Sequence, residues 1–304
     1  MASPVRLTRD VAAALAAGRP VVALESSVFA QGLPIPANRR AAERMEQGVR
    51  AGGAVPAVAA VVHGTPTLGL EPVELERFLA REGVRKVSAR DLPGAIVDRA
   101  DGATTVAATL AIAHRAGVHV FATGGIGGVH REPPFDESAD LIELARIPMI
   151  VVCAGAKSIL DLAATLERLE TLGVPVIGYR TDALPGFFTV TSGLPTSGRA
   201  GSAREVAMLF RAHQALGRPG ALLVVQPPPA EFALPAELVE RAVAGALAAA
   251  RESGIRGASV TPFLLASVEQ ATGGRSLETN LALLEANARL AGEIAVALVD
   301  PLPG

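Results

Sequence analysis

The sequence contains very few cysteines and aromatic residues. Its single cysteine, Cys153, excludes an intramolecular disulfide framework and a zinc site built from several thiolates. Aromatic residues make up 3% of the chain, with no tryptophan and one tyrosine. This argues against the base-stacking platforms of single-stranded nucleic-acid binders. Because Cys153 lies in an apolar run, we expect it to be a buried thiol with a structural role.

Runs of basic residues and long apolar runs are also missing. The chain has 28 basic and 30 acidic residues and a net charge of −2, which argues against nucleic acid or an anionic membrane surface as a partner. No stretch reaches the roughly 18 apolar residues that a membrane-spanning helix needs. The N-terminus lacks the apolar centre of a signal peptide. We therefore expect a soluble, cytoplasmic protein.

Lysine is the rarest charged residue. Only Lys86 and Lys157 occur, so the other 26 of the 28 basic residues are arginines. A guanidinium stays protonated at ordinary pH, whereas a lysine amine can lose its proton and attack a carbonyl carbon. A lysine kept in an arginine-rich chain is therefore a candidate for chemistry. The alternative is that these two lysines have simply not been replaced, and it has more weight at Lys86.

Short apolar segments alternate with longer segments of helical period. Strands are predicted at 21–26, 57–64, 86–90, 118–125, 149–155, 174–179 and 221–227, and helices at 38–53, 71–83, 103–117, 138–146 and 159–173. This alternation predicts an α/β fold with a largely parallel central sheet covered on both faces. The C-terminal third is predicted to be helical, at 235–254 and 276–298. We expect one domain over residues 1–304, with a loop or lid at 187–202.

Reactive side chains follow several of the predicted strands. In open α/β sheets, ligands bind beyond the carboxyl ends of the strands. Glu25 follows VVAL, and Lys157 follows MIVVCAG. We expect Lys157 to precede a helix that begins near Ser158, whose dipole would lower the pKa of the amine. Burial would raise the pKa of Glu25 and suit it to general acid catalysis, unless it is a core carboxylate paired with an arginine.

Two segments next to these strands could bind an anion. The glycine-rich turn TGGIGGVH (123–130) permits close approach of a phosphate, or is only a tight turn after a strand. The segment ATTVA (103–107) opens a helix, so its free N–H groups and the hydroxyls of Thr104 and Thr105 offer a second anion site.

Acidic residues cluster around a third helix start. FDESAD (135–140) contains Asp136, Glu137 and Asp140. One or two of these carboxylates could hold Mg²⁺ or Mn²⁺ together with several waters. The alternative is ordinary capping of the helix and its dipole.

These motifs occur together, in the same order, in one family. LESSVFAQGLPIPAN, KVSARDL, GATTVA, FATGGIGGVHR, FDESADL, VVCAGAKSILDL and TGGRSLETN lie within about residues 5–298, and with them the chain resembles the pseudouridine-5′-phosphate glycosidases, relatives of indigoidine synthase A. The resemblance implies a three-layer α/β/α sandwich that assembles as a homotrimer. It also implies reversible cleavage of the C–C glycosidic bond of pseudouridine 5′-phosphate, a small nucleotide, to uracil and ribose 5-phosphate.

The resemblance assigns roles to individual residues. By the family's pattern, Lys157 is the nucleophile that forms an imine with the sugar C1′, and Glu25 is the proton donor. Asp136 would hold one Mn²⁺ per subunit, with Mg²⁺ as a substitute. The substrate contacts that the resemblance implies are Lys86, the backbone of Val106, Ser138, Ala139, Asp140, His130 and Asn280.

The chemistry gives an independent reason for a lysine. A carbon-linked base is a poor leaving group for hydrolysis by two carboxylates, whereas a lysine imine provides an electron sink. Two alternatives remain. One is another imine-forming sugar-phosphate lyase of the class I aldolase type, which would be indifferent to the base. The other is a non-catalytic nucleotide-binding protein, in which Lys157→Arg would bind ligand nearly normally.

Overall fold

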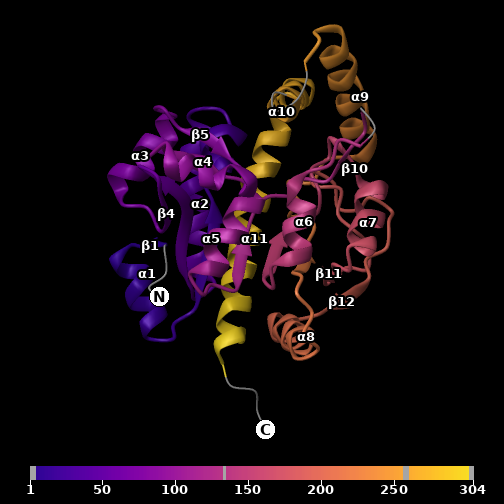
Figure 1. Cartoon of the computed structure of the whole chain (residues 1–304). Coiled ribbons are helices and arrows are strands. Elements are labelled where there is room, and N and C mark those ends of the chain that lie inside the picture. Colours follow the sequence, from indigo (N-terminus) through magenta and orange to yellow (C-terminus); the bar gives the residue numbers. More distant parts are fainter. Residues whose placement is uncertain (1–4, 133–134, 256–259, 301–304) are drawn as a thin grey trace.

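A largely parallel sheet forms the centre of the computed structural model, which describes residues 5–132, 135–255 and 260–300 (Figure 1). Within these ranges the strand order is β1-β4-β3-β2-β7-β9-β13-β11-β12, and β6 and β5 extend from β3. The strands of this sheet are β1 (Arg6–Leu7), β2 (Val21–Glu25), β3 (Val55–Val62), β4 (Thr65–Leu68), β5 (Arg85–Val87), β6 (Gly102–Thr104), β7 (Val120–Ala122), β9 (Ile150–Cys153), β11 (Val176–Tyr179), β12 (Gly198–Ala200) and β13 (Leu222–Val225). A separate antiparallel pair joins β8 (Val129–His130) to β10 (Leu160–Asp161).

The central strands are buried along their whole length. Every residue of β2 (VVALE) and β9 (IVVC) is buried, and these runs are rich in β-branched residues. Strands of this kind are typical of parallel sheets covered on both faces. In the described part of the main sheet, only the β3–β4 and β3–β6 pairs are antiparallel. The predicted parallel sheet is therefore confirmed.

Helices cover both faces of the sheet. They are α1 (Arg9–Ala16), a π-helical turn η1 (Val28–Gly32), α2 (Ala37–Ala51), α3 (Pro72–Ala80), a 3-10 turn η2 (Ala89–Asp91), α4 (Leu92–Val97), α5 (Val106–Arg115), α6 (Ala139–Arg146), α7 (Leu162–Thr171), α8 (Ala203–Ala215), α9 (Ala236–Glu252), α10 (Val260–Ala271) and α11 (Arg275–Val299). Helix α11 packs on β2, β7 and β9 together with α2 and α8, while α5 packs on β2 and β3 beside α6. The three-layer arrangement agrees with the prediction.

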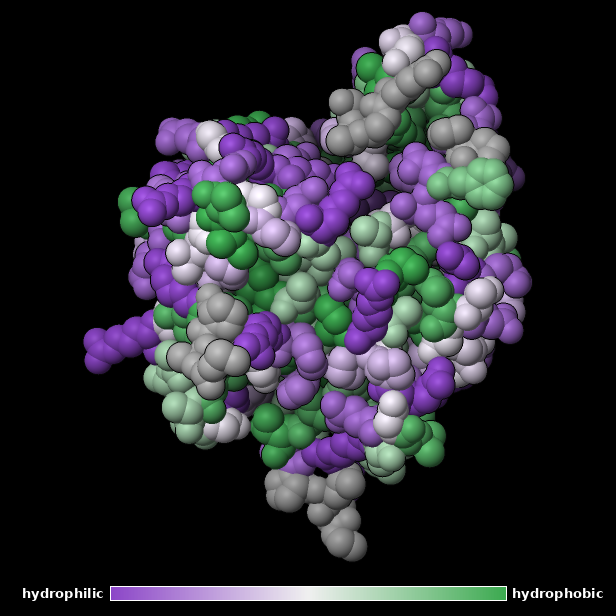
Figure 2. Space-filling model, viewed as in Figure 1, coloured by the Kyte–Doolittle hydropathy of each residue, from purple (hydrophilic) through white to green (hydrophobic). Residues whose placement is uncertain are grey.

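Helix α11 runs the height of the main body, and α9 and α10, which pack against each other, stand above it (Figures 1 and 2). Residues from Val5 to Ala295 join one hydrophobic core. A continuous core of this kind is consistent with a single domain. The assignment of residues 1–304 to one domain stays a prediction. In the described ranges, no helix is both long and apolar enough to cross a bilayer.

One predicted helix start was wrong. Leu160 and Asp161 pair with β8, so the helix expected near Ser158 begins only at Leu162. The side chain of Asp161 caps this helix by accepting a hydrogen bond from the N–H of Ala164 at 2.9 Å. A capping aspartate favours a helix start directly after it. Lys157 therefore does not lie at a helix N-terminus.

Candidate active site

The carboxyl ends of β2, β7 and β9 bring the first candidate residues together. These three strands are adjacent and parallel, with Leu24 opposite Ala122 and Ala122 opposite Val152. Glu25 is the last residue of β2, Thr123 follows β7, and Lys157 lies shortly after β9. The edge of the sheet at which the sequence predicted a site therefore carries a carboxyl group and an amine.

The carboxyl group of Glu25 is buried and is bound by two hydroxyl groups. The residue is 4% exposed, and its two carboxyl oxygens accept hydrogen bonds from the hydroxyls of Thr123 at 2.6 Å and Ser27 at 2.9 Å. Burial raises the pKa of Glu25, and the positive charge of Lys157 opposes this shift. Among the described residues, no arginine forms an ion pair with Glu25. The raised pKa is the property that the sequence led us to expect of a proton donor.

The two lysines lie at the same site. Much of the surface of Lys86 is exposed to solvent, but protein atoms lie around most of its side chain. The loss of solvent around the amine lowers the pKa of Lys86, and the positive charge of Lys157 lowers it further. Lys157 is partly buried, and its backbone N–H donates to the carbonyl of Ile126 at 3.2 Å. Each lysine therefore lies within the electrostatic reach of the other and of Glu25.

The polar residues of the acidic segment 135–140 have different partners. Both carboxylate oxygens of Asp140 are taken by backbone amides, those of Ala107 at 2.9 Å and Gly127 at 2.8 Å. Glu137 forms an ion pair with Arg168 at 2.9 Å. The hydroxyl of Ser138 caps α6, and the acidic residue in the first turn of this helix is Asp140. Asp136 remains as the carboxylate of this segment that could reach a metal.

Few side chains that could bind a metal ion lie around Asp136. It is partly buried, and its carbonyl accepts a hydrogen bond from the N–H of His130 at 2.9 Å. The described residues contain no group of three or more histidine, cysteine, aspartate or glutamate side chains that could hold a metal ion. A divalent cation at Asp136 would therefore depend on water and substrate oxygens for most of its ligands, which is common for Mg²⁺.

The two threonines of the predicted anion site at 103–107 have different surroundings. Thr104 is fully buried, and its hydroxyl donates to the carbonyl of Ala59 at 2.8 Å and contacts the hydroxyl of Thr109 at 2.9 Å. It has a structural role and does not face a ligand. The hydroxyl oxygen of Thr105 is buried and has no hydrogen-bond partner within the part of the chain that the structure describes. Val106 is the first residue of α5, so its amide has no acceptor within the helix.

The glycine-rich turn makes room for side chains. A Cβ on Gly125 would lie 2.7 Å from the ring of Phe187, and one on Gly127 would lie 2.2 Å from the Ser138 hydroxyl. A Cβ on Gly128 would lie 2.4 Å from the hydroxyl of Thr165. The turn therefore holds glycines because neighbouring side chains approach its backbone closely. This packing accounts for the glycines of the motif, and the binding of a phosphate at the turn stays a prediction.

These residues line two connected hollows, which we call the inner and the outer chamber. The inner chamber has a volume of about 50 Å³ and the outer chamber about 400 Å³. Their shared lining residues are Glu25, Ser27, Lys86, Lys157 and Thr261. The candidate acid and the candidate nucleophile therefore stand at the junction of the two chambers.

The chambers differ in chemical character. The outer chamber is polar and contains Val106, His130, Asp136, Ser138, Ala139 and Asp140 together with Ser88, Arg90 and Thr105. The inner chamber contains Asn280 and is otherwise lined by Val28, Gln31, Thr123, Gly124, Gly125, Phe187, Pro262 and Leu265. All ten residues predicted from the sequence line one chamber or both, and their individual roles stay predictions.

Sequence reasoning missed several lining residues. Gln31 comes from the π-helical turn η1, Phe187 from the segment 187–202, and Leu265 from α10, a helix that the sequence reading did not predict. Phe187 has a φ of 65°, in the left-handed region that bulky side chains rarely adopt. Unusual backbone of this kind is found often at functional sites, and π-helical turns are too.

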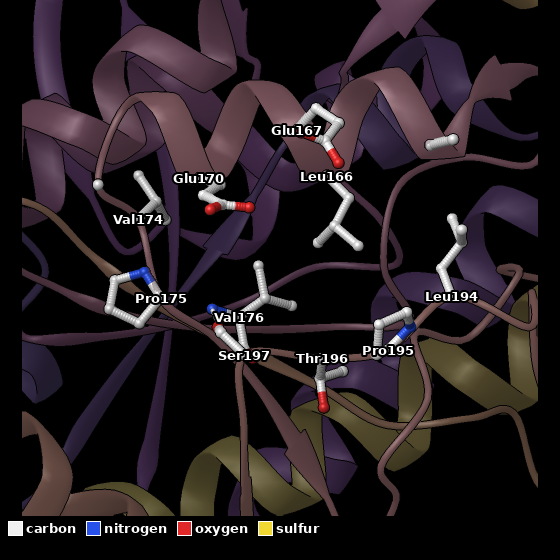
Figure 3. Close-up of a pocket in the computed structure, with 12 residues that line it drawn as sticks. Leu166, Glu167, Glu170, Val174, Pro175, Val176, Leu194, Pro195, Thr196 and Ser197 are labelled. Carbon is white, nitrogen blue, oxygen red and sulfur yellow. Dashed lines mark hydrogen bonds between the residues drawn. The ribbon is translucent and has the colours of Figure 1, made fainter.

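A third hollow lies away from these residues. It has a volume of about 610 Å³ and lies between α7 and the segments around Val176 and Pro195 (Figure 3). Leu166 and Glu170 extend into it from α7 (Figure 3). None of the ten residues predicted from the sequence lines it, so it is not part of the candidate active site.

Known proteins resemble the chain over nearly its whole length. Residues 10–297 match the family described as indigoidine synthase A like protein, and the chain belongs to this family. The pseudouridine-5′-phosphate glycosidase of Gemmatimonas aurantiaca is 64% identical over 98% of the chain and 97% of its own length. The protein of the same name from Chloroflexus aurantiacus is 52% identical over 97% of the chain and 99% of its own length.

Solved structures have the same fold. The prealnumycin C-glycosynthase AlnA, crystallised with ribulose 5-phosphate, superposes with a TM-score of 0.90 at 42% identity and covers 97% of each chain. An indigoidine synthase A-like protein from Thermotoga maritima superposes with a TM-score of 0.89 at 37% identity, also over 97% of each chain. The resemblance inferred from the sequence motifs is thereby confirmed.

Cys153 has no part in the site. It is fully buried at the end of β9, and burial raises its pKa to about 12. A thiol in this state is neither a nucleophile nor a metal ligand. The burial that the sequence predicted for this thiol is confirmed.

Proposed function

We propose that the chain is a pseudouridine-5′-phosphate glycosidase that acts through an imine on Lys157. The observation that carries this proposal is the position of Glu25 and Lys157 at the junction of a polar and a largely apolar chamber. If the sugar phosphate lies in one chamber and the base in the other, the bond between them lies at the junction. The proton donor and the nucleophile are then next to the bond that breaks. The names of the most similar curated relatives describe this activity.

The charges of the chambers assign the two parts of the substrate. A phosphate dianion fits the outer chamber, which has Arg90 and the first amide of α5 at Val106. Two of the carboxylates that line this chamber are already paired, Asp140 with backbone amides and Glu137 with Arg168. The inner chamber has no arginine among its described lining residues, and it shares both of its lysines with the outer chamber. A flat, uncharged pyrimidine suits that chamber, and the ring of Phe187 gives it an apolar surface. The bond between C1′ and the base then crosses the junction.

The reaction follows from these positions. The Nζ of Lys157 forms a bond to C1′ while the C1′–O4′ bond breaks and O4′ takes a proton. A proton delivered to the base carbon C5 then lets the C1′–C5 bond break, and the nitrogen lone pair closes the imine. Water releases ribose 5-phosphate and restores the amine. Glu25 supports this sequence because its raised pKa keeps a proton available near the bond that breaks.

Trapping with sodium borohydride tests the imine. Incubation of the chain with ribose 5-phosphate and borohydride is expected to add one reduced sugar phosphate at Lys157, identified by intact mass and peptide mapping. Lys157→Arg keeps the charge but has no nucleophilic amine, so it is expected to show neither adduct nor turnover. Arg204→Lys, on an exposed position of α8, is the matched control, since it adds an amine away from the chambers and should leave the single adduct at Lys157.

The same experiment separates the alternatives. Formation of pseudouridine 5′-phosphate from ribose 5-phosphate and uracil is expected of the glycosidase and not of a class I aldolase. A folded wild-type chain that binds ribose 5-phosphate and forms no adduct at any lysine would refute the nucleophile. Ligand binding without turnover in both wild type and Lys157→Arg would instead support the non-catalytic binding protein.

We further propose Asp136 as the protein ligand of a Mn²⁺ or Mg²⁺ ion. Such an ion would supply positive charge for the substrate oxygens in the outer chamber, which Asp136 lines. Treatment with a chelator is expected to abolish turnover, and Mn²⁺ is expected to restore it in wild type but not in Asp136→Ala. Isothermal titration of the apoprotein with Mn²⁺ checks binding directly, and full binding by Asp136→Ala would contradict this assignment.

The homotrimer and the cytoplasmic location stay predictions from the sequence and the resemblance. Light scattering of the purified chain measures the oligomeric state, with a mass of three subunits expected. Fractionation of source cells checks the location.

A further inference from the structure

Two buried amide oxygens in the inner chamber have no hydrogen-bond partner among the described residues. They are Oε1 of Gln31 and Oδ1 of Asn280, and both residues line the chamber. Asn280 is 9% exposed, and its Oδ1 would lie 3.4 Å from a Cβ on Gly124, so it faces the glycine-rich turn. Buried acceptors are nearly always paired in folded proteins. Two unpaired ones in a single small chamber indicate a ligand that brings two donors.

The base of pseudouridine has two such donors. Because its sugar is attached through C5, both ring nitrogens, N1 and N3, carry a hydrogen. In uridine the sugar occupies N1, so only the N3–H remains. The number of unpaired amide acceptors in the inner chamber therefore matches the carbon-linked base. This step depends on the function proposed above.

We propose that Gln31 is a specificity-determining residue that accepts a hydrogen bond from one N–H of the base, while Asn280 accepts from the other. Asn280 was expected to contact substrate from the family resemblance, whereas nothing in the sequence analysis assigned a role to Gln31. Together the two amides favour a pyrimidine joined through carbon over one joined through nitrogen.

The surroundings of Gln31 hold it in place independently of the reaction. It lies on η1, the π-helical turn that follows Glu25 and Ser27. The side chain of Asn38 donates to the carbonyl of Phe29 at 3.1 Å and to that of Leu79 at 2.9 Å, which fixes the turn against α3. With the backbone of the turn fixed, only the side chain of Gln31 has to be ordered when the base binds, which favours discrimination between similar bases.

Substitution of Gln31 by methionine tests the proposal. Methionine has nearly the length of glutamine but no amide. The control is Gln214→Met on an exposed position of α8. The substrates are pseudouridine 5′-phosphate and its N1-methyl and N3-methyl derivatives, each of which lacks one N–H.

The wild type is expected to discriminate against both methyl derivatives by about 100-fold or more in kcat/KM, because a site built to bind an N–H rejects its absence strongly. Gln31→Met is expected to lower kcat/KM for the parent by about 10- to 100-fold. For one methyl derivative, the ratio of its kcat/KM to that of the parent is expected to come within a few-fold in Gln31→Met. For the other derivative, this ratio is expected to stay as it is in wild type. Borohydride trapping of ribose 5-phosphate on Lys157 should equal that of wild type.

Three results would overturn the proposal. The first is a kcat/KM of Gln31→Met within two-fold of the Gln214→Met control, as expected if the amide holds only water. The second is an equal loss on all three substrates with unchanged discrimination. The third is loss of the borohydride adduct, which would indicate a structural role. A wild type without turnover of pseudouridine 5′-phosphate would refute the proposed function itself, and the wild-type measurement shows this separately.

Discussion

Glu25 combines a buried carboxyl with hydroxyl donors and a nearby amine. Its pKa is raised because burial outweighs the charge of Lys157 and the hydrogen bonds from Thr123 and Ser27. A buried acid of this kind binds its proton more tightly in the folded chain than in the unfolded chain, where its ordinary value is 4.5. Its contribution to stability is therefore greatest below pH 4.5 and is lost as the pH rises through the folded-state pKa.

Glu25→Gln is expected to separate catalysis from stability. The variant cannot ionise, so its unfolding free energy should fall less than that of wild type as the pH rises above 4.5. Its amide can still accept from Thr123, and the Ser27 hydroxyl can accept from the new N–H. Turnover should drop by about 10²- to 10⁴-fold because the proton donor is gone.

Urea unfolding between pH 4 and 9, with Glu252→Gln as an exposed control, checks the stability of the Glu25→Gln variant, and steady-state kinetics check its activity. Parallel pH profiles of stability in wild type and Glu25→Gln would contradict the assignment of a raised pKa.

At the residue scale, the sequence was sufficient to predict which side chains follow the strands and line the chambers. Lys157 and Glu25 were found because a parallel sheet brings the ends of its strands to one edge. Gln31 and Phe187 were missed because they lie in a π-helical turn and an irregular segment, where no period tells which side chain faces a cavity. Lys157 was placed correctly for a partly wrong reason, since the helix after it begins at Leu162.

At the scale of elements, the glycine-rich turn after β7 sets the shape of both chambers. Its glycines let Phe187 approach from one side and Ser138 and Asp140 from the other. The sequence showed that the turn would be tight, but it did not show which segments approach it. Phe187 lies far along the chain from the turn, and short strands such as β8 and β10 likewise depend on long-range pairing.

Gly125→Ala is expected to damage both activity and stability. The new methyl would lie 2.7 Å from the Phe187 ring and 2.9 Å from the carbonyl of Gly155, so one of them must move. Overpacking of this kind costs about 1–3 kcal/mol, and a displaced wall in the inner chamber is expected to lower kcat/KM by about 100-fold. Thermal unfolding and kinetics measure the two effects.

Gly94→Ala serves as the control for Gly125→Ala. Gly94 lies in α4 with nothing within 4 Å of its added Cβ, and we expect no loss there. Equal behaviour of the two variants would contradict the packing account of the turn.

At the scale of the whole molecule, α11 links the sheet, α2 and the active site. It has 25 residues, a length of about 37 Å, and it carries Asn280 near its first turn. Its contact with α2 is close because Gly292 lies against Gly52: a Cβ on Gly292 would be 2.7 Å from the carbonyl of Val49. We therefore expect the stability of the fold to depend on this helix pair.

Gly292→Ala is expected to destabilise the chain by about 1–3 kcal/mol because the two helices must separate. Gly245→Ala in α9 is the matched control, since it is also a glycine inside a helix and nothing lies within 4 Å of its added Cβ. There alanine should stabilise the helix by about 0.5–1 kcal/mol. Urea unfolding measures both, and a Gly292→Ala variant as stable as Gly245→Ala would refute the role of the close helix contact.

The scarcity of lysine noted at the outset has a practical consequence, because both lysines line the chambers. A protease that cuts only after lysine divides the chain into fragments 1–86, 87–157 and 158–304. A sugar fixed on the amine of Lys157 hides the second cut, so 87–157 and 158–304 stay joined. The proportion of the joined fragment on a gel then reports the occupancy of the active site, without a substrate analogue or a radioactive label.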